Sequence, residues 1–469
     1  MGGTKRRVQV SAAGVGVTVL LAACGYGDGG GGGGVGDEGG PLTVWTLENL
    51  PDRLAVQEEI AAAFTESSGI EVELVGIDED QFNQLLTSSA AAGELPDVVG
   101  ALPLAGVQAL ATNELLAPDV AADVVEGLGA DTFSERALEL TRDGDTQLAV
   151  PSDSWAQLLV YRKDLFDAAG LAPPETYEGI LAAAQALDGP EMAGFTGATA
   201  PNDAFTQQTF EHLALGNGCQ LVDDGGEVTL DSDRCVAAFE FYDQLITDYS
   251  VSGTQDVDTT RAAYFAGQAA MVVWSSFILD EMAGLRADAL PTCPECSADP
   301  AFLARNSGVV TAIAGPDGDE GAQFGEVVSW AVTADAQTDA ATQFVTYMLE
   351  DGYEQWIGFS PEGKVPTRQG TADEPTRFID AWATLPAGVD TKAPLSDFYS
   401  AEVLDGLRNA PDTISPWGIP QGQGALVGAS LGELPVPQAI SAMTGGELDP
   451  QQAAQQAADA LREIASSLE

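Results

Sequence analysis

The chain is short of positive charge and nearly lacks histidine. Its 469 residues contain 18 Lys and Arg against 72 Asp and Glu, with one histidine and a formal net charge of −54. Proteins that bind nucleic acid neutralise its phosphates with a basic surface, and no basic patch here could offset so negative a field. We therefore expect no nucleic acid among the partners.

Motifs of the common catalytic sites are also missing. The single histidine, His212, lies in the apolar stretch FEHLAL without a G-x-S-x-G elbow, which argues against a Ser-His-acid triad. No Walker loop or zinc-protease helix is present. A carboxylate pair for glycoside hydrolysis is uninformative in a chain so rich in Asp and Glu. We expect no catalysis, cofactor or metal, and keep an extracellular glycoside hydrolase as an alternative.

Cysteine is scarce, with five residues in all. Cys219 and Cys235 flank a turn-rich loop, and Cys293 and Cys296 form a CxxC motif. One CxxC and one histidine make a poor set of zinc ligands, and an exported protein favours disulfides. We expect structural disulfides among these four cysteines, with the pairing left open.

No uninterrupted apolar run is long enough for a comfortable membrane span. Lys5-Arg6-Arg7 precedes an apolar stretch that ends at Ala23, so residues 1–23 are typical of a secretory signal. Leu21-Ala22-Ala23-Cys24 matches a bacterial lipobox, which implies cleavage before Cys24 and diacylglycerol on its sulfur. Arg6-Arg7 leaves the export route open between Sec and twin-arginine. Residues 24–41 are mostly glycine, and we expect them to form a flexible tether.

The remaining chain alternates strand and helix patterns. The first strand is predicted at Leu42 to Trp45, and two further strand-and-helix units follow before residue 100, which predicts a parallel α/β lobe. Leu158 to Tyr161 is an apolar run typical of a strand covered on both faces. Just before it, Pro151 to Trp155 is predicted to be an irregular segment facing a cleft, and a later strand is expected at Gly325 to Val332.

Several of these segments carry a family resemblance. QLAVPSDSWAQLLVYRKDLFDAAG, beginning at Gln147, together with FTESSGIEVELV, TSSAAAGELPDVV, YFAGQAAM and the turn GKVP, resembles the extracellular solute-binding proteins of ABC importers, family 1, the maltose-binding-like group. The resemblance implies an α/β, two-lobed periplasmic-binding-protein-like fold with a ligand cleft between the lobes and multiple hinge crossovers. The N-terminal lobe would comprise residues 42–153 and 308–362, and the C-terminal lobe residues 154–307 and 363–469.

Aromatic and polar side chains lie beside the predicted strand ends, where ligands of open α/β sheets bind. An indole presents a flat apolar face that suits the hydrocarbon face of a pyranose, and carboxylates suit its hydroxyls. Residue types and resemblance together predict these ligand contacts: Trp45, Glu48, Asn49, Asp97, Asp153, Trp155, Trp274, Phe277, Trp330 and Trp417. Either Trp274 or Phe277 could make the contact after YFAGQAAM. Trp356 and Trp382 are expected in the core.

The expected function is therefore that of a lipid-anchored receptor at the extracellular face of the cell membrane. It would act as a monomer, capture a mono- or oligosaccharide by lobe closure and deliver it to the permease subunits of an ABC importer. As an alternative, the same fold would bind a glycerol phosphoester, polyamine, peptide or iron chelate. A phosphate ligand would need arginine, and Arg368 is the one well-placed candidate.

Overall fold

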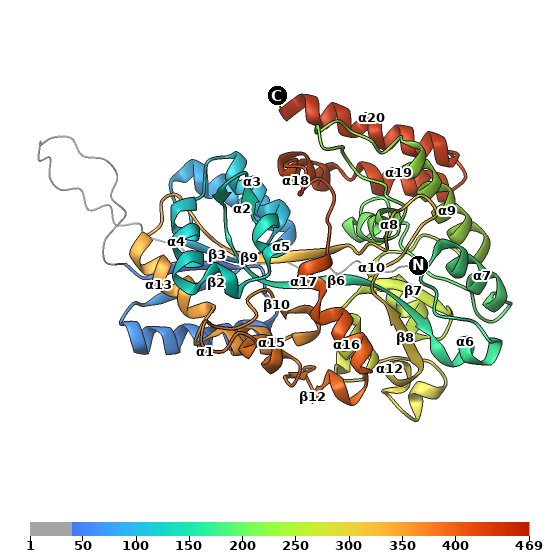
Figure 1. Cartoon of the computed structure of the whole chain (residues 1–469), viewed down its shortest axis with the longest axis horizontal. Helices are drawn as coiled ribbons and strands as arrows, with labels where there is room; N and C mark the ends of the chain where they lie inside the picture. Colours follow the sequence, from blue (N-terminus) through green and yellow to red (C-terminus); the bar gives the residue numbers. More distant parts are fainter. Residues whose placement is uncertain (1–39, 469) are drawn as a thin grey trace, which may run out of the picture. The chain divides into compact units, whose positions relative to one another are not determined.

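The computed structural model describes residues 40–468, so the predicted signal, Cys24 and nearly all of the predicted tether lie outside the described residues. Residues 40–468 lie within one unit, organised around a sheet in the order β10-β6-β9-β3-β1-β2, with β7 and β8 also paired to β6 (Figure 1). Its strands are β1 (Leu42–Thr46), β2 (Val72–Gly76), β3 (Val98–Pro103), β6 (Val150–Arg162), β7 (Met271–Ser275), β8 (Ser307–Val310), β9 (Gly325–Val332) and β10 (Val365–Pro366). No helix among the described residues is both long enough and apolar enough to cross a membrane.

The first lobe is built on the parallel strands β1, β2 and β3, as predicted. Helix α1 (Pro51–Ser68) connects β1 to β2, and α2 (Glu79–Ala92) connects β2 to β3. Pro51 occupies the first turn of α1, where its missing N–H costs nothing, and Gly69 ends the helix with φ 80°. These short connections place the carboxyl ends of β1 and β3 at one edge of the sheet.

Strand β6 passes from the first lobe into the second. Residues 150–156 pair with β9, and residues 157–162 pair with β7 and β8. Along its 13 residues every side chain is buried except the half-buried Trp155. The prediction of an irregular segment from Pro151 to Trp155 is wrong, because these residues are part of this strand. Pro151 is tolerated because the pairing with β9 shifts register between Pro151 and Asp153, where a ladder bond is absent.

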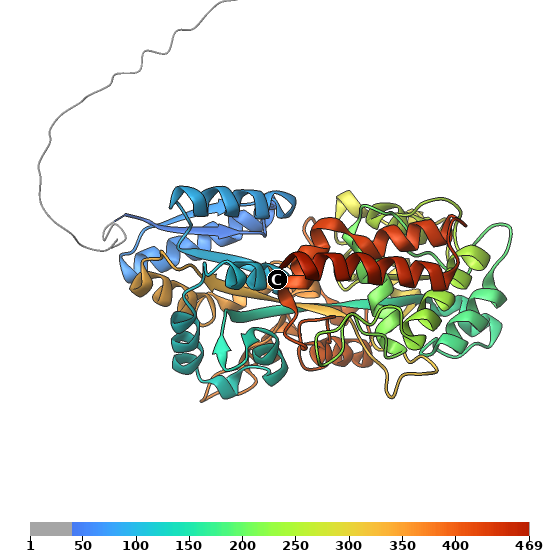
Figure 2. The same cartoon turned by 90° about the horizontal axis from the view of Figure 1, so that it is seen from above.

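The second lobe covers the other end of β6 with helices. Helices α19 (Pro435–Thr444) and α20 (Pro450–Leu468) lie side by side in both views (Figures 1 and 2). Asp449 caps α20 by accepting the Gln452 amide at 2.8 Å, as the Asp-Pro pair predicts. The predicted cysteines pair as Cys219–Cys235 and Cys293–Cys296.

Two helices that lie far apart in the sequence also touch directly. Helix α18 (Gly424–Glu433) packs on α3 (Leu104–Thr112), and a Cβ at Gly424 would lie 2.1 Å from Cγ of Gln108. Glycine is therefore required for this close approach.

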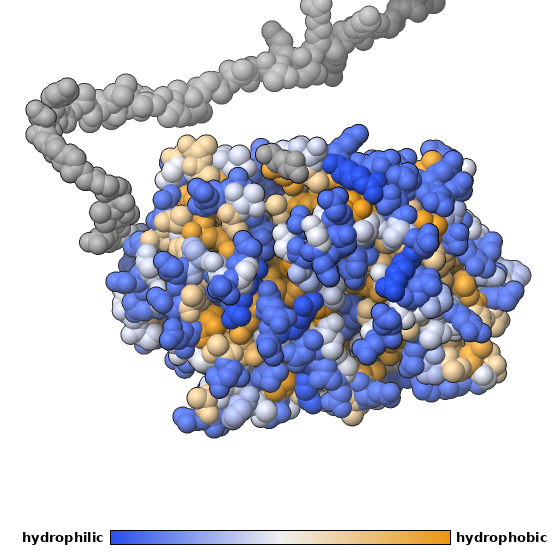
Figure 3. Space-filling model, turned by 45° about the horizontal axis from the view of Figure 1, so that its top comes forward, coloured by the Kyte–Doolittle hydropathy of each residue, from blue (hydrophilic) through white to orange (hydrophobic). Residues whose placement is uncertain are grey.

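The other helices surround these elements: α4 (Pro118–Leu128), α5 (Glu135–Leu140), α6 (Lys163–Ala169), α7 (Tyr177–Leu187), α8 (Ala204–Gly216), α9 (Asp233–Tyr249), α10 (Val257–Phe265), α11 (Ile278–Met282), α12 (Phe302–Asn306), α13 (Thr338–Met348), α14 (Tyr353–Gly358), α15 (Arg377–Trp382), α16 (Ala401–Arg408) and α17 (Ala410–Thr413). The outer face seen in Figure 3 is mostly hydrophilic with small apolar patches. Trp356 and Trp382 lie in the core, as predicted.

Candidate functional site

A buried lysine joins three segments at the crossover. Nζ of Lys364, which is 1% exposed, lies 2.7 Å from Oε1 of Glu48 and 3.2 Å from Oδ2 of Asp153. Glu48 follows β1, Asp153 belongs to β6, and Lys364 precedes β10. The ammonium also lies 4.2 Å from the ring centroid of Trp356, whose Nε1 donates to Asp153 at 2.6 Å. We call Glu48, Arg53, Asp153 and Lys364 the lysine cluster.

The charges of the lysine cluster are matched internally. Burial acts most strongly on Glu48 and would raise its pKa, but the charges of Lys364 and Arg53 outweigh it and lower that pKa to about 2. Burial raises the pKa of Asp153 despite the charge of Lys364. Glu48 is therefore the principal anion of the pair. The charged side chains of the lysine cluster already have oppositely charged partners within the cluster. We therefore expect the cluster to hold the crossover segments in position and not to bind a ligand.

A second set of polar side chains comes from β6, β9 and α8, around the strand that carries the half-buried Trp155. It comprises the side chains of Gln157 on β6, Gln207, Glu211 and His212 on α8, and Glu326 on β9. We call these five residues the glutamine cluster.

Contacts through Phe324 connect its elements. The rings of Trp155 and Phe324 pack edge-on, with their centroids 5.8 Å apart. The backbone amide of Phe324 donates a hydrogen bond to Nδ1 of His212 at 3.3 Å. The Gln157 amide donates to the Phe324 carbonyl at 2.9 Å, and Trp155 pairs with Glu326 across β6 and β9.

The glutamine cluster contains buried polar atoms without hydrogen-bond partners among the described residues. They are Oε1 and Nε2 of Gln157, Oε1 of Gln207, Nε2 of His212 and Oε2 of Glu326. An unpaired buried polar atom costs about 1–3 kcal/mol, so such atoms are rare in folded proteins. Their concentration here is typical of a site whose partners come from a bound molecule.

In the glutamine cluster, burial shifts the pKa values of Glu211, Glu326 and His212 in the direction that favours the neutral form of each side chain. Burial raises the pKa of Glu211 to about 8, with the charge of Glu326 adding to the effect, although the Trp417 amide donates to it. Burial likewise raises the pKa of Glu326 to about 8. Burial lowers the pKa of His212 to about 3. At neutral pH this region therefore carries little charge and can both donate and accept hydrogen bonds.

The structure distributes the predicted contacts over several places. Glu48 and Asp153 belong to the lysine cluster, and half-buried Phe277 lies beside it, with the Arg53 guanidinium 5.3 Å from its ring centroid. Trp155 borders the glutamine cluster, and half-buried Asn49 follows Glu48 after β1.

The other predicted contacts are engaged within the protein. Trp417 is 1% exposed and donates from Nε1 to the Cys219 carbonyl at 2.9 Å. Trp274 donates to the Val257 carbonyl at 3.1 Å, and Trp45 is buried in the first lobe.

Trp330 and Asp97 are also surrounded by protein. Trp330 is 1% exposed, with its ring centroid 4.8 Å from that of Trp356, although its Nε1 has no hydrogen-bond partner among the described residues. Asp97 accepts the amides of Thr43 and Gln337, both at 2.7 Å.

The sequence patterns did not predict the residues of the glutamine cluster, although they predicted its neighbour Trp155. One signal was available, because Gln157 follows Trp155 by two positions and strand alternation places both on one face of β6. Nothing local in the α8 sequence distinguishes Gln207 and Glu211 from other polar residues of a helix.

Arg368 does not suit the phosphate role considered for it. Its guanidinium donates to the carbonyls of Leu349 at 2.6 Å and Leu128 at 3.1 Å, and to Oγ1 of Thr132 at 3.2 Å. Arg368 is 1% exposed, so its donors already serve the core.

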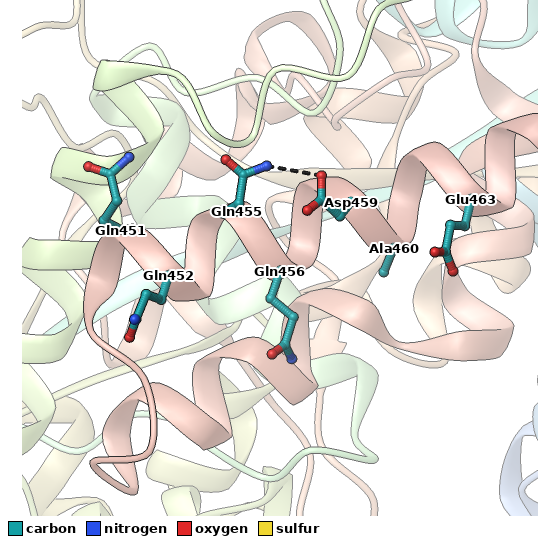
Figure 4. A pocket seen from close by; sticks show the side chains of 7 residues that line it. All are labelled: Gln451, Gln452, Gln455, Gln456, Asp459, Ala460 and Glu463. Atoms are coloured by element: carbon teal, nitrogen blue, oxygen red, sulfur yellow. Dashed lines mark hydrogen bonds between the residues drawn. The ribbon is translucent and has the colours of Figure 1, made fainter.

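Neither a surface hollow on α20 nor a group of metal-binding side chains provides a competing site among the described residues. A hollow of about 610 Å³ lies on α20, and Figure 4 shows that its seven lining side chains all project from that one helix. A single convex helix face cannot surround a ligand. Across residues 40–468, no group of three or more His, Cys, Asp or Glu side chains is arranged to hold a metal.

Comparisons with known proteins agree with this architecture. The sequence pattern of the family described as "Bacterial extracellular solute-binding protein" matches residues 59–391. YcjN of Escherichia coli (strain K12), whose name places it among ABC transporter periplasmic-binding proteins, is 28% identical over 334 residues, which are 69% of this chain and 72% of that protein.

Solved structures of sugar-binding proteins have the same fold. The GacH receptor of Streptomyces glaucescens GLA.O, solved unliganded and with acarbose or an acarbose homolog, is 21% identical with a TM-score of 0.67, over 90% of this chain and 98% of that chain. Maltose-bound MalE3 of T. maritima is 18% identical with a TM-score of 0.68, over 90% and 99%. The cyclic alpha-maltosyl-1,6-maltose binding protein of Arthrobacter globiformis is 20% identical with a TM-score of 0.66, over 91% and 100%.

Proposed function

Because the chain belongs to the bacterial extracellular solute-binding proteins, which are binding proteins of ABC transporters and not enzymes, we propose that it captures a carbohydrate and delivers it to an importer permease. The predicted family and two-lobed fold are confirmed. The carbohydrate and its delivery are the proposed steps.

One observation carries the carbohydrate assignment. The half-buried indole of Trp155 lies beside the unpaired amide atoms of Gln157 on the same strand face. A sugar presents an apolar ring face and a rim of hydroxyls that donate and accept, which matches an indole flanked by amides and neutral carboxyls. The sugar complexes of the structural neighbours support the same ligand class.

Capture would proceed by closure of the lobes. We assign the N-terminal lobe to residues 42–153 and 308–362 and the C-terminal lobe to residues 154–307 and 363–469. A ligand that touches α8 and Trp155 on one side and Glu326 or Asn49 on the other favours the state in which both sets of contacts form. The permease would then recognise the closed state of a monomeric receptor.

The N-terminus would hold this receptor at the membrane. We propose lipidation of Cys24 and anchoring at the extracellular face of the cell membrane. Replacing Cys24 by serine should release the protein into the culture medium. Retention of the C24S protein in the membrane fraction would contradict the anchor.

A thermal-shift screen with neutral mono- and oligosaccharides tests the proposed function. A carbohydrate that binds the folded state raises the melting temperature, and chromatography of the same samples should detect no hydrolysis products. If a polyamine or phosphoester raises the melting temperature and no carbohydrate does, the carbohydrate assignment is wrong.

A further inference from the structure

We infer that the preferred carbohydrate carries a protonated amine, which Glu211 and Glu326 would hold inside the glutamine cluster. This inference rests on the proposed function and narrows its ligand class from sugars in general to cationic sugars.

The first observation is that two carboxyl groups approach the same region from different elements. Glu211 on α8 accepts the Trp417 amide at 2.6 Å through Oε1, and Glu326 on β9 accepts the Leu104 amide at the start of α3. The two side chains are close enough for the charge of Glu326 to disfavour ionisation of Glu211. The two carboxyl groups therefore act on one another from α8 and β9, and Oε2 of Glu326 has no hydrogen-bond partner among the described residues.

The second observation is the kind of neighbour that these carboxyls have. Some inward-facing acids of the protein do have cations beside them: Lys364 lies beside Glu48 and Asp153, and Arg261 lies 2.8 Å from Glu281. The charged groups that act on Glu211 and Glu326 are themselves acidic, namely Glu326 and Glu79. His212, the nearest basic side chain in sequence, has its pKa lowered by burial and stays neutral.

The third observation points independently to a ligand. Gln157 is fully buried with both amide atoms unpaired, and Gln207, which is 5% exposed, hydrogen-bonds Glu211 while its Oε1 has no donor. Hydroxyls of a sugar would supply these missing partners, and the indole of Trp155 would cover its ring. An ammonium on that sugar would be the cation that the two carboxyls lack.

Binding of a cationic sugar would change the protonation of the two carboxyl groups. Without a ligand, both carboxyls are largely protonated at pH 7, since their pKa values are raised to about 8. An ammonium favours the ionised form of the carboxyl that it meets, so that group passes its proton to the solvent as the charge-assisted hydrogen bond forms. A neutral sugar brings no such charge and releases no proton from these groups.

The test compares sugars in which a hydroxyl is replaced by a protonated amine. Affinities at pH 7 would be measured by titration calorimetry for glucose against glucosamine, galactose against galactosamine, and cello-oligosaccharides against chitosan oligosaccharides with free amines. At least one amine sugar should bind tenfold or more tightly than its neutral partner. Repeating that titration in buffers of different ionisation enthalpy should reveal release of protons, up to one per ligand.

Variants assign the effect to the two carboxyls. Glu211→Gln and Glu326→Gln should each reduce the preference for the amine to less than twofold, where the preference is the ratio of the affinities for the amine sugar and its neutral partner in the same variant. Glu320→Gln, at an exposed position in the connection between β8 and β9, should keep the full preference. Melting temperatures would identify any variant that fails to fold.

The outcomes separate this inference from the proposed function. If neutral sugars bind and no amine sugar binds better than its neutral partner, the inference is overturned and the proposed function stands. If no sugar of either kind binds the wild-type protein, the proposed function itself fails.

Discussion

Nζ of Lys364 lies 2.7 Å from Oε1 of Glu48 in a place where the lysine side chain is 1% exposed. The pair connects the loop after β1 to the segment that leads into β10, 316 positions apart in the chain (364 − 48). Asp153 of β6 is the third member. The buried ammonium of Lys364 therefore connects three chain segments at the crossover through its contacts with Glu48 and Asp153.

Replacing Lys364 by methionine should strongly destabilise the protein. The change leaves Glu48 and Asp153 without that cation in a buried place, and breaking a buried ion pair costs roughly 3–5 kcal/mol. Urea unfolding checks the loss. The double variant Lys364→Met and Glu48→Gln should recover part of it, and an unchanged unfolding midpoint in Lys364→Met would contradict the role given to this cluster.

The stabilising contribution of Glu48 should disappear in acid. Its pKa is lowered from the ordinary 4.5 to about 2, so the folded state holds the ionised form more strongly than the unfolded chain does. The contribution, roughly 3 kcal/mol, is complete above pH 4.5 and is lost as the pH falls toward 2. The stability difference between the wild type and Glu48→Gln should therefore shrink over that range. A difference that is constant from pH 6 to pH 3 would refute this.

Glu211 should have the opposite dependence in the ligand-free protein. Its pKa is raised to about 8 by burial, so the unfolded chain gains from ionisation between pH 4.5 and 8 while the folded state does not. Stability is lost as the pH rises through this range, roughly 4–5 kcal/mol for this group. Glu211→Gln should match the wild type near pH 5 and exceed it at pH 8. Parallel stability profiles of the two proteins would argue against a neutral buried carboxyl.

Replacing Trp155 by alanine should affect mainly carbohydrate binding, whereas replacing Trp330 should affect mainly the stability of the fold. Trp155 is half-buried beside the unpaired amides, so Trp155→Ala should weaken carbohydrate binding by roughly 1–3 kcal/mol with a small change in melting temperature. Trp330 is 1% exposed among aromatic neighbours, so Trp330→Ala should cost about 3–5 kcal/mol of stability. Calorimetric titration and thermal melts of both variants check this. Equal affinity in wild type and Trp155→Ala would remove this indole from the site.

The disulfide Cys219–Cys235 should contribute measurably to stability. It closes a loop with a sequence separation of 16, and the chain-entropy estimate for such a loop is about 3 kcal/mol. The double variant Cys219→Ala and Cys235→Ala should unfold at lower urea concentration than the wild type under oxidising conditions. Identical midpoints would mean that the bridge does not constrain the unfolded chain.

Local sequence signals predicted many of the elements correctly. Alternating strand and helix patterns before residue 100 predicted the parallel strands β1 to β3, because apolar periodicity and short connections leave few other arrangements. The start of α20 is likewise a local matter, because Asp449 caps it through the amide of Gln452, three positions along the chain. The segment at Pro151 was mispredicted because its strand character comes from pairing with the distant β9.

The candidate site depended more on tertiary structure. Residue type together with the family resemblance identified Trp155 as a contact candidate. Whether Trp330 and Trp417 are exposed or buried depends on neighbours hundreds of residues away, such as Phe210 against Trp417.

The sequence by itself determined the family, the lobes expected from it and the pairs of cysteines available for bridging, because these follow from ordered local patterns and from composition. The tertiary structure alone decided which polar groups are matched and which are left without partners. Glu48 and Glu211 are both glutamates, and the residues next to them in the chain do not show which charges will lie near them in the fold. Folding places Lys364 and Arg53 beside the first and acidic Glu326 beside the second. Burial strengthens every such difference, since charge interactions are weakly screened away from water.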